Sequence, residues 1–195
     1  TQGVSSAASD VYKRQVYEGT PITDVEKAFA PLGLPMGPFQ LIDLVGWKVA
    51  AHVQDTMAHA FPDRFYANEN FHALAELDAV VEKDKGGRVT GWTKQAEKLL
   101  RPAVGKTPAS AETILQRVQD GLASEIKLML DEGVVPEVED IDLCLILGAG
   151  WPFIDGGASP YLDREGASQR AFGGEFHTCL LYTSPSPQDA TLSRM

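Results

Sequence analysis

The sequence predicts an all-α protein made of two similar helical repeats. Apolar residues recur at steps of three and four in several segments, which is the period of an amphipathic helix. Alternating apolar and polar residues, the pattern of a strand, are nearly absent. An internal repeat is the third observation, because it matches a helical region near the start with another in the second half of the chain.

Both ends of the chain resemble translated sequencing-library adapters. Residues 10–15 read "DVYKRQ" and residues 179–184 read "CLLYTS", and reverse-complementary DNA can encode the two strings. Two ends of a natural protein have no reason to be related in this way. We therefore expect residues 1–15 and 179–195 to be non-native, and a native insert of residues 16–178 that was cut from a longer chain. A natural tail rich in Ser and Pro is the alternative.

Composition narrows the function classes. The chain of 195 residues is 44% hydrophobic and 23% charged, as globular domains are, and its net charge is −10. An acidic chain lacks the basic face that nucleic-acid binding needs, so we expect no nucleic-acid partner. No apolar run approaches the roughly 20 residues of a membrane span. Cys144 is the only cysteine of the insert, which excludes an intramolecular disulfide and suits a reducing compartment.

The first expected repeat covers residues 16–83 and is truncated at its start. The string "TDVE" at residues 23–26 predicts a capping box that opens a short helix towards Leu32. Pro38 suits the first turn of a second helix, "PFQLIDLV", and Gly46 predicts its end.

Two further helices are expected in this repeat. Residues 47–61 and 71–83 both show apolar spacing of three and four, and Pro62 ends the first of them. The expected apolar face of the first helix holds Ala50, Val53, Met57 and Phe61, and that of the second holds Leu74, Leu77 and Val81. Residues 84–109 then connect the repeats, beginning with the Gly-rich loop "DKGGRVTGWT".

The second expected repeat covers residues 110–178. Its longest helix runs from about Ser110 to Glu132, with Gly133 as its stop. The apolar positions of this helix are spaced by four and comprise Ile114, Val118, Leu122, Ile126 and Leu130.

A further helix is expected over residues 137–147, closed by Gly148. The acidic pair Glu139 and Asp140 stands at its start, where the helix dipole favours negative charge. Cys144 lies on this apolar helix and is expected to pack as a small hydrophobic residue. The string "GAGWPFIDGG" comes next and follows a helix, not a strand, so it predicts a helix stop and loop and no phosphate-binding turn.

The internal repeat pairs short elements of the two halves. The pairs are Glu18-Gly19 with Glu132-Gly133, Asp24-Val25-Glu26 with Asp140-Ile141-Asp142, Gly33-x-Pro35 with Gly150-x-Pro152, and Asp43-x-x-Gly46 with Asp163-x-x-Gly166. They predict two units that pack face to face, each covering apolar surface of the other. A chance match of helix ends is the alternative.

The strings "GLPMGPFQLIDLVG" and "LDEGVVPEVEDIDLCLILGAGWPFIDGG" resemble the two C-terminal helical repeats of L-3-hydroxyacyl-CoA dehydrogenases. The tandem arrangement is similar to the large multifunctional subunit of bacterial fatty-acid β-oxidation, in which an enoyl-CoA hydratase and a dehydrogenase share one chain. The resemblance covers nearly all of residues 17–168 and implies a pseudo-dimer of repeats, like the C-terminal domain of 6-phosphogluconate dehydrogenase. Residues 62–108 depart from the family pattern, since "GGRVTGWTKQ" lacks the usual "GKGFY" type of element, and they leave the subfamily open.

The resemblance implies NAD-dependent oxidation of an L-3-hydroxyacyl-CoA to the 3-oxoacyl thioester. In the family a Rossmann domain binds NAD and supplies the His-Glu pair that removes the hydroxyl proton. This chain has no G-x-G-x-x-G after a strand, so we expect no cofactor site and no catalytic residue in it. The Asn-Arg pair of the family's long first helix would precede residues 16–19, and in the second repeat its position falls on Gln116 and Arg117.

Four residues are implied to form the substrate site. By resemblance Met36, Gly37, Pro38 and Phe39 lie near the acyl-CoA thioester, at the cleft between the helical and Rossmann domains. Gly37 lets the backbone approach closely, and Met36 and Phe39 offer an apolar wall to an acyl chain. The alternative is that Met36 and Phe39 fill the helical core.

The histidines do not predict a metal site. His52 and His59 are two helical turns apart and share a face, but no third ligand stands at a similar spacing. His72 is isolated, and His177 lies beside the expected non-native end. We expect solvated or hydrogen-bonded histidines and no metal.

The leading interpretation is a fragment of an NAD-dependent 3-hydroxyacyl-CoA dehydrogenase that contributes an acyl-CoA cleft and interdomain or dimer contacts and is inactive alone. Its expected partners are the acyl-CoA substrate, the Rossmann domain and a thiolase subunit, in a bacterial-like cytoplasm. A non-catalytic helical module for dimerisation or docking is the competing class, and another dehydrogenase with an all-α C-terminal domain is a third interpretation. The coding sequence upstream of residue 16 decides between them. We further expect weak folding or self-association, with apolar faces exposed around Phe29, Leu32 and Leu41.

Overall fold

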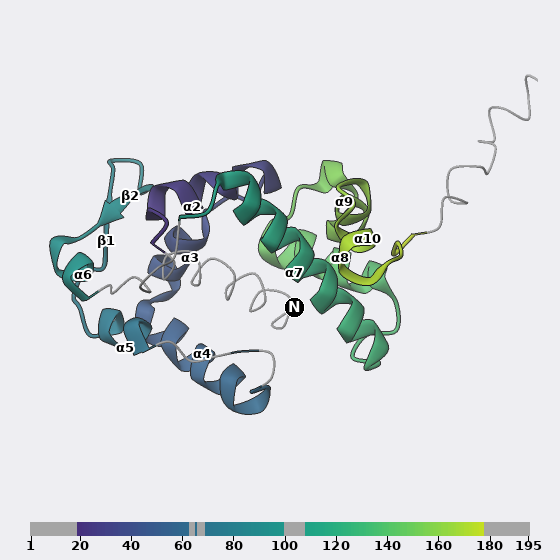
Figure 1. Cartoon of the computed structure of the whole chain (residues 1–195), viewed down its shortest axis with the longest axis horizontal. Coiled ribbons are helices and arrows are strands. Elements are labelled where there is room, and N and C mark those ends of the chain that lie inside the picture. Colours follow the sequence, from purple (N-terminus) through teal and green to yellow (C-terminus); the bar gives the residue numbers. More distant parts are fainter. Residues whose placement is uncertain (1–18, 63–64, 66–68, 100–107, 178–195) are drawn as a thin grey trace, which may run out of the picture.

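The structure, a computed structural model, describes residues 19–62, 65, 69–99 and 108–177. These residues form mostly helices and one antiparallel pair of short strands, so the all-α prediction is confirmed apart from the strands (Figure 1). The elements in chain order are α2 Ile22–Ala28, η1 Ala30–Leu32, α3 Pro38–Val45, α4 Trp47–Ala60, α5 Glu69–Ala75, β1 Val81–Lys83, β2 Val89–Trp92, α6 Lys94–Leu99, α7 Ala111–Asp131, α8 Val138–Ala149, η2 Phe153–Asp155, α9 Ala158–Arg164 and α10 Ala167–Phe172. The two ends expected to be non-native lie outside the described residues.

Helix α2 begins directly after Pro21, and its N-terminus receives no side-chain hydrogen bond. The predicted capping box is therefore wrong, because Thr23 already lies inside the helix and Glu26 bonds elsewhere. Helix α3 starts with Pro38 in its first turn and ends at Gly46, as predicted. Gly46 has a φ of +103°, a conformation that favours glycine.

Helix α4 matches the predicted range but presents a different face to the core. Its buried side chains are Trp47, Ala51 and Gln54. Of the predicted face, Ala50, Val53 and Met57 are only half-buried, and Phe61 at its end is 42% exposed. Trp47 sets the rotation of the helix because its ring packs into an aromatic cluster. Its ring centroid lies 5.2 Å from that of Phe71, 5.9 Å from that of Trp92 and 6.4 Å from that of Phe39.

A β-hairpin replaces a predicted helix and loop. Helix α5 ends at Ala75, and Val81 of β1 then pairs with Trp92 of β2. The Asp84 carboxylate closes the turn, because it accepts hydrogen bonds from the backbone N–H of Gly86 and of Arg88. Strand β2 contacts α2, so tertiary packing supplies the stability that a two-stranded sheet lacks by itself. Helix α6 was likewise absent from the predicted connection.

Helix α7 confirms the prediction for the longest helix. The Ser110 hydroxyl caps its N-terminus by accepting a hydrogen bond from the Thr113 N–H at 3.2 Å, and Gly133 follows its end with a φ of +67°. The predicted stripe is buried over its first four members, whereas Met129 is buried in place of Leu130.

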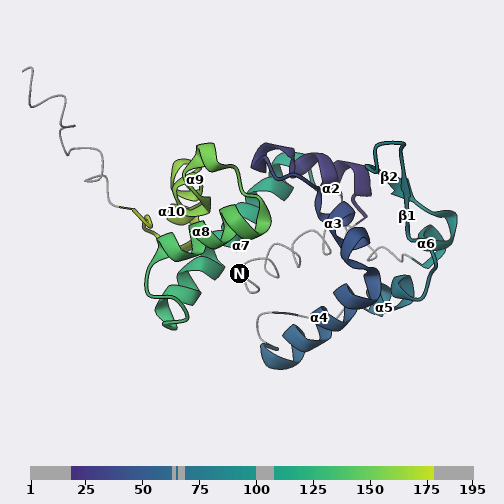
Figure 2. The same ribbon diagram turned by 180° about the vertical axis from the view of Figure 1, so that it is seen from behind.

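The helices that follow α7 in the chain pack against it. Figures 1 and 2 both show α8, α9 and α10 grouped against this helix, while α2 to α6 and the strands form the other half, with α2 touching α7. Helix α8 continues past Gly148 and ends at Gly150, so its predicted end is wrong. Cys144 is exposed, contrary to the prediction, because α8 turns Ile141 and Leu145 to the core instead.

One core cluster of buried side chains joins the two halves, from Ile22 to Ala167. Where they meet, two Gly-x-Pro elements contact each other reciprocally. A Cβ atom on Gly33 would lie 2.6 Å from Cγ of Pro152, and a Cβ atom on Gly150 would lie 3.0 Å from Cγ of Pro35. These are two of the pairs in the internal repeat, so equivalent elements face each other.

Candidate functional site

An open groove of about 700 Å³ lies between α2, the turn before α3 and the hairpin. Helix α2 contributes Thr23, Glu26 and Lys27, the turn contributes Leu34, Met36 and Gly37, and the hairpin contributes Arg88, Val89 and Thr90. The groove is therefore lined by apolar side chains together with cationic, hydroxyl and carboxylate groups.

Two of the four predicted substrate residues reach this groove. Met36 and Gly37 line it and are partly exposed. Pro38 and Phe39 are buried, and Phe39 is only 1% exposed. The Phe39 ring meets that of Trp92 edge-on at 5.4 Å, so Phe39 occupies the core as in the alternative interpretation.

Glu26 is a groove residue that the sequence did not predict. Its Oε1 atom accepts hydrogen bonds from the backbone N–H of Phe39 at 2.7 Å and of Gln40 at 3.3 Å, in the first turn of α3. Gly37 is the N-cap residue of α3 and has no side chain to make these bonds. Burial raises the pKa of the Glu26 carboxyl, and the two backbone N–H groups oppose that shift. One sequence signal could have indicated this contact. Gly37 at the start of α3 has no capping side chain, so the cap must come from another part of the chain.

Gly37 and Glu26 interlock. A Cβ atom on Gly37 would lie 1.4 Å from Oε2 of Glu26 and 2.5 Å from its Cδ. The φ of Gly37 is −70°, which any residue adopts, so space and not backbone conformation requires the glycine.

A similar arrangement lies in the second half of the chain. Asp142, which the internal sequence match pairs with Glu26, accepts hydrogen bonds from the backbone N–H and the hydroxyl of Ser159 at the start of α9. A Cβ atom on Gly157 would lie 2.4 Å from Cγ of Asp142. Burial raises the pKa of Asp142, while the bonds from Ser159 and the charge of His177 act against it.

A serine and a histidine meet in this region without forming a catalytic pair. His177 Nε2 lies 2.8 Å from Ser159 Oγ. Ser159 is fully buried, and the carboxylate of Asp142 bonds the serine rather than the imidazole, which is not the order of a nucleophilic triad. Elsewhere His72 pairs with Asp55 at 2.9 Å.

His52 and His59 are exposed, as solvated side chains would be. Among the residues that the structure describes, no three His, Cys, Asp or Glu side chains gather closely enough to hold a metal ion. In the same residues, no helix has the length and apolar character to cross a membrane.

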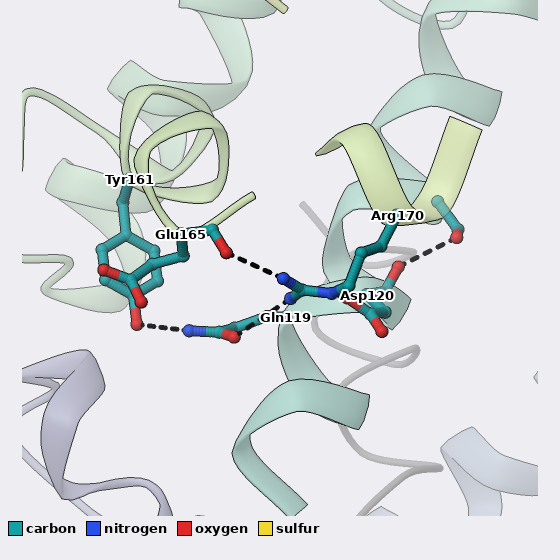
Figure 3. Close-up of polar contacts among 6 residues, drawn as sticks. Gln119, Asp120, Tyr161, Glu165 and Arg170 are labelled. Carbon is teal, nitrogen blue, oxygen red and sulfur yellow. Dashed lines mark hydrogen bonds and ion pairs between the residues drawn. The ribbon is translucent and has the colours of Figure 1, made fainter. Parts of the chain in front are cut away.

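A polar network fixes α9 and α10 to α7 (Figure 3). Gln119 Nε2 donates to the Tyr161 hydroxyl at 2.8 Å, and Arg170 Nε donates to Asp120 at 2.8 Å. Arg170 also donates to the backbone carbonyl of Glu165 at 2.8 Å, as Figure 3 shows. Burial raises the pKa of the Tyr161 hydroxyl, and the Gln119 bond opposes this.

The position of the family's Asn-Arg pair lies one turn before this network on α7. Gln116 and Arg117 there are both exposed. Neither side chain lines the groove.

Comparison with known proteins finds similarity to one family. Residues 6–91 match the family model described as 3-hydroxyacyl-CoA dehydrogenase, C-terminal domain; this range includes residues 6–15 of the expected non-native end. The chain is 26% identical over 194 residues to a glyoxysomal fatty acid beta-oxidation multifunctional protein, MFP-a, of Cucumis sativus, covering 87% of this chain and 27% of that protein. It is 28% identical over 176 residues to the fatty acid oxidation complex subunit alpha of Pseudomonas syringae pv. tomato, covering 81% of this chain and 24% of that protein.

The mostly helical fold and these similarities support a dehydrogenase-type helical domain. The similarities point in particular to the C-terminal domain of 3-hydroxyacyl-CoA dehydrogenases. The chain spans about a quarter of the length of the two relatives.

Proposed function

We propose that the chain is part of an NAD-dependent L-3-hydroxyacyl-CoA dehydrogenase within a multifunctional fatty-acid β-oxidation protein, and that it forms one wall of the acyl-CoA cleft. The observation that carries this proposal is the groove beside α2, which holds Met36 and Gly37 within the range of the family match. The names of the two relatives support the multifunctional parent.

The groove residues suit an acyl-CoA thioester. Met36 offers a flexible apolar surface to an acyl chain, and Gly37 leaves its backbone accessible. Lys27 and Arg88 line the same groove, and their charges suit the phosphates of CoA. These side chains bind and orient, and none of them is placed to remove the hydroxyl proton.

The chemical step requires a hydride acceptor and a base. We assign both to a Rossmann domain of the parent protein, which would bind NAD and supply the base. A thiolase subunit is a further proposed partner, and a bacterial-like cytoplasm is the proposed location. The chain alone should therefore turn over no acetoacetyl-CoA with NADH, and measurable turnover by the purified chain would contradict this assignment.

We also propose that the two repeats pack as a pseudo-dimer. The reciprocal contacts of Gly33 with Pro152 and of Gly150 with Pro35 support this arrangement. The equivalent carboxylates Glu26 and Asp142, each bonded to the start of the next helix, support it independently.

A methyl-labelled NMR titration tests the acyl-CoA cleft. The chain has four methionines, so selective ¹³C labelling of their methyl groups gives a spectrum that can be assigned by substitution. Acetoacetyl-CoA should shift the Met36 signal and leave those of Met57 on α4 and Met129 in the core unchanged. A Met36 signal that stays in place at saturating ligand would exclude the groove as the acyl-CoA site.

A further inference from the structure

We propose that Glu26 is a positioning residue that sets the wall of the groove by fixing the turn of Met36 and Gly37. The inference rests on the proposed function where it concerns acyl-CoA, but its geometric part is independent of any ligand. Glu26 touches no reacting atom in this proposal and acts through the turn.

The two carboxylate oxygens of Glu26 hold the turn before α3 in place. Oε1 holds the backbone N–H groups of Phe39 and Gln40, so it ties α2 to the first turn of α3. Oε2 lies in the space that a side chain at Gly37 would occupy. The turn cannot approach α2 because the carboxylate fills that space, and it cannot retreat without breaking two hydrogen bonds.

Glu26 also lines the groove itself, so its contacts bear directly on the shape of the groove. Glu26, Met36, Gly37 and Gln40 all line the groove, so the carboxylate is bonded to the backbone of one groove residue, Gln40. Lys27 beside it pairs with Asp24 at 3.6 Å. In the part of the chain that the structure describes, the partners of Glu26 are thus the backbone donors of α3, whose helix dipole favours a negative charge there.

The second repeat provides a matched control for this role. Asp142 makes the same kind of bonds to α9 and fills the space beside Gly157, but it does not line the groove. Loss of either carboxylate should weaken the fold in the same way, because each removes the cap of a helix. Only the loss of Glu26 should change the groove.

The first readout needs no ligand. Glu26→Ala should displace the Met36 methyl signal, Asp142→Ala should leave it in place, and both variants should lower the melting temperature. Glu26→Gln should restore the Met36 signal, because the amide oxygen can still accept both N–H groups. If Glu26→Ala fails to fold, Glu26→Asp serves in its place, since it withdraws the acceptor by one methylene. A Met36 signal unchanged in the folded Ala or Asp variant would overturn the proposal.

The second readout is the affinity for acetoacetyl-CoA, measured at the Met36 signal. Glu26→Ala should weaken binding roughly tenfold, as expected for loss of a helix cap that orders the site, whereas Asp142→Ala and Glu26→Gln should bind nearly as the wild type does. Equal affinities of the two Ala variants would contradict the positioning role. If the wild-type chain shows no ligand-dependent shift, the proposed function fails, while the ligand-free displacement still decides the role of Glu26.

Discussion

Gly37 shows how one residue can be required for space alone. Gly37→Ala places a methyl group against Glu26 and should lower the free energy of unfolding by about 1–3 kcal/mol, because either the carboxylate or the turn must move. Gly148→Ala is the matched control, since it lies in α8 with no atom within 4 Å of the added Cβ. The control should gain up to about 1 kcal/mol from helix propensity. Urea denaturation measures both changes, and equal effects would contradict the steric argument.

The buried carboxyls of Glu26 and Asp142 predict a pH dependence of stability. Burial raises the pKa of each group in the folded state, so the folded chain holds these protons more firmly than the unfolded chain does. Their contribution to stability is therefore fully present below the unfolded-state pKa and is lost as the pH rises through the folded-state pKa. As the pH rises above about 4, the ordinary range of free carboxyls, the variant Glu26→Gln with Asp142→Asn should show a smaller decline of the free energy of unfolding than the wild type. Parallel declines in urea titrations at each pH would refute the linkage.

Single residues also show which features a local signal could predict. The Gly-Pro pair predicted the start of α3, whereas Met36 and Gly37 were assigned to the substrate site only through the family resemblance; the structure places both in the groove. Phe39 could not be placed, since its burial depends on Trp47 and Trp92, which the chain brings in from two other elements. Glu26 was misassigned for the same reason, because its partners lie 13 and 14 residues away.

At the scale of elements, α7 and the hairpin differ in how far local signals determine them. Helix α7 has a capping serine, apolar residues at every fourth position and a terminal glycine, so the sequence alone predicted it. Strand β1 has three residues, too few to show a period, and its formation depends on pairing with β2 and on the packing of β2 against α2. The helix predicted over residues 71–83 followed apolar spacing that in fact belongs to α5 and the strand.

The cap of α7 gives a prediction at this scale. Ser110→Ala removes the acceptor for the Thr113 N–H and should cost about 1 kcal/mol of stability. Ser124→Ala on the same helix is the control, because the Ser124 hydroxyl is exposed and only bonds back to the Asp120 carbonyl. Its effect should be near zero or slightly stabilising. Thermal melting followed by circular dichroism distinguishes the two, and a loss as large in the control would exclude a specific cap.

At the scale of the whole molecule, the apolar surface differs from the prediction. Phe29 and Leu32 are buried, so the exposure expected around them is wrong, while Leu41 is exposed as expected. Both side chains belong to the single core cluster, which continues through the contact of α2 with α7. Among the described residues, the most exposed large apolar side chains lie instead on η2, where Phe153 is 83% and Ile154 is 94% exposed.

The exposed side chains of Phe153 and Ile154 on η2 predict self-association of the isolated chain. Phe153→Ser combined with Ile154→Ser should shift the sedimentation profile towards the monomer, because apolar patches of this kind promote association. Val134→Ser, at an exposed apolar residue after α7, should change the profile much less. A wild-type chain that sediments as a monomer at every concentration would contradict the prediction.

The reciprocal Gly-x-Pro contact has an evolutionary consequence. The proline ring of each half rests where the glycine of the other half has no side chain. Both glycines also have positive φ angles, +64° at Gly33 and +72° at Gly150, so a side chain at either position is strained whatever its neighbour. Homologues that keep this contact should therefore retain both glycines, whereas the two prolines are limited only by the space between the segments.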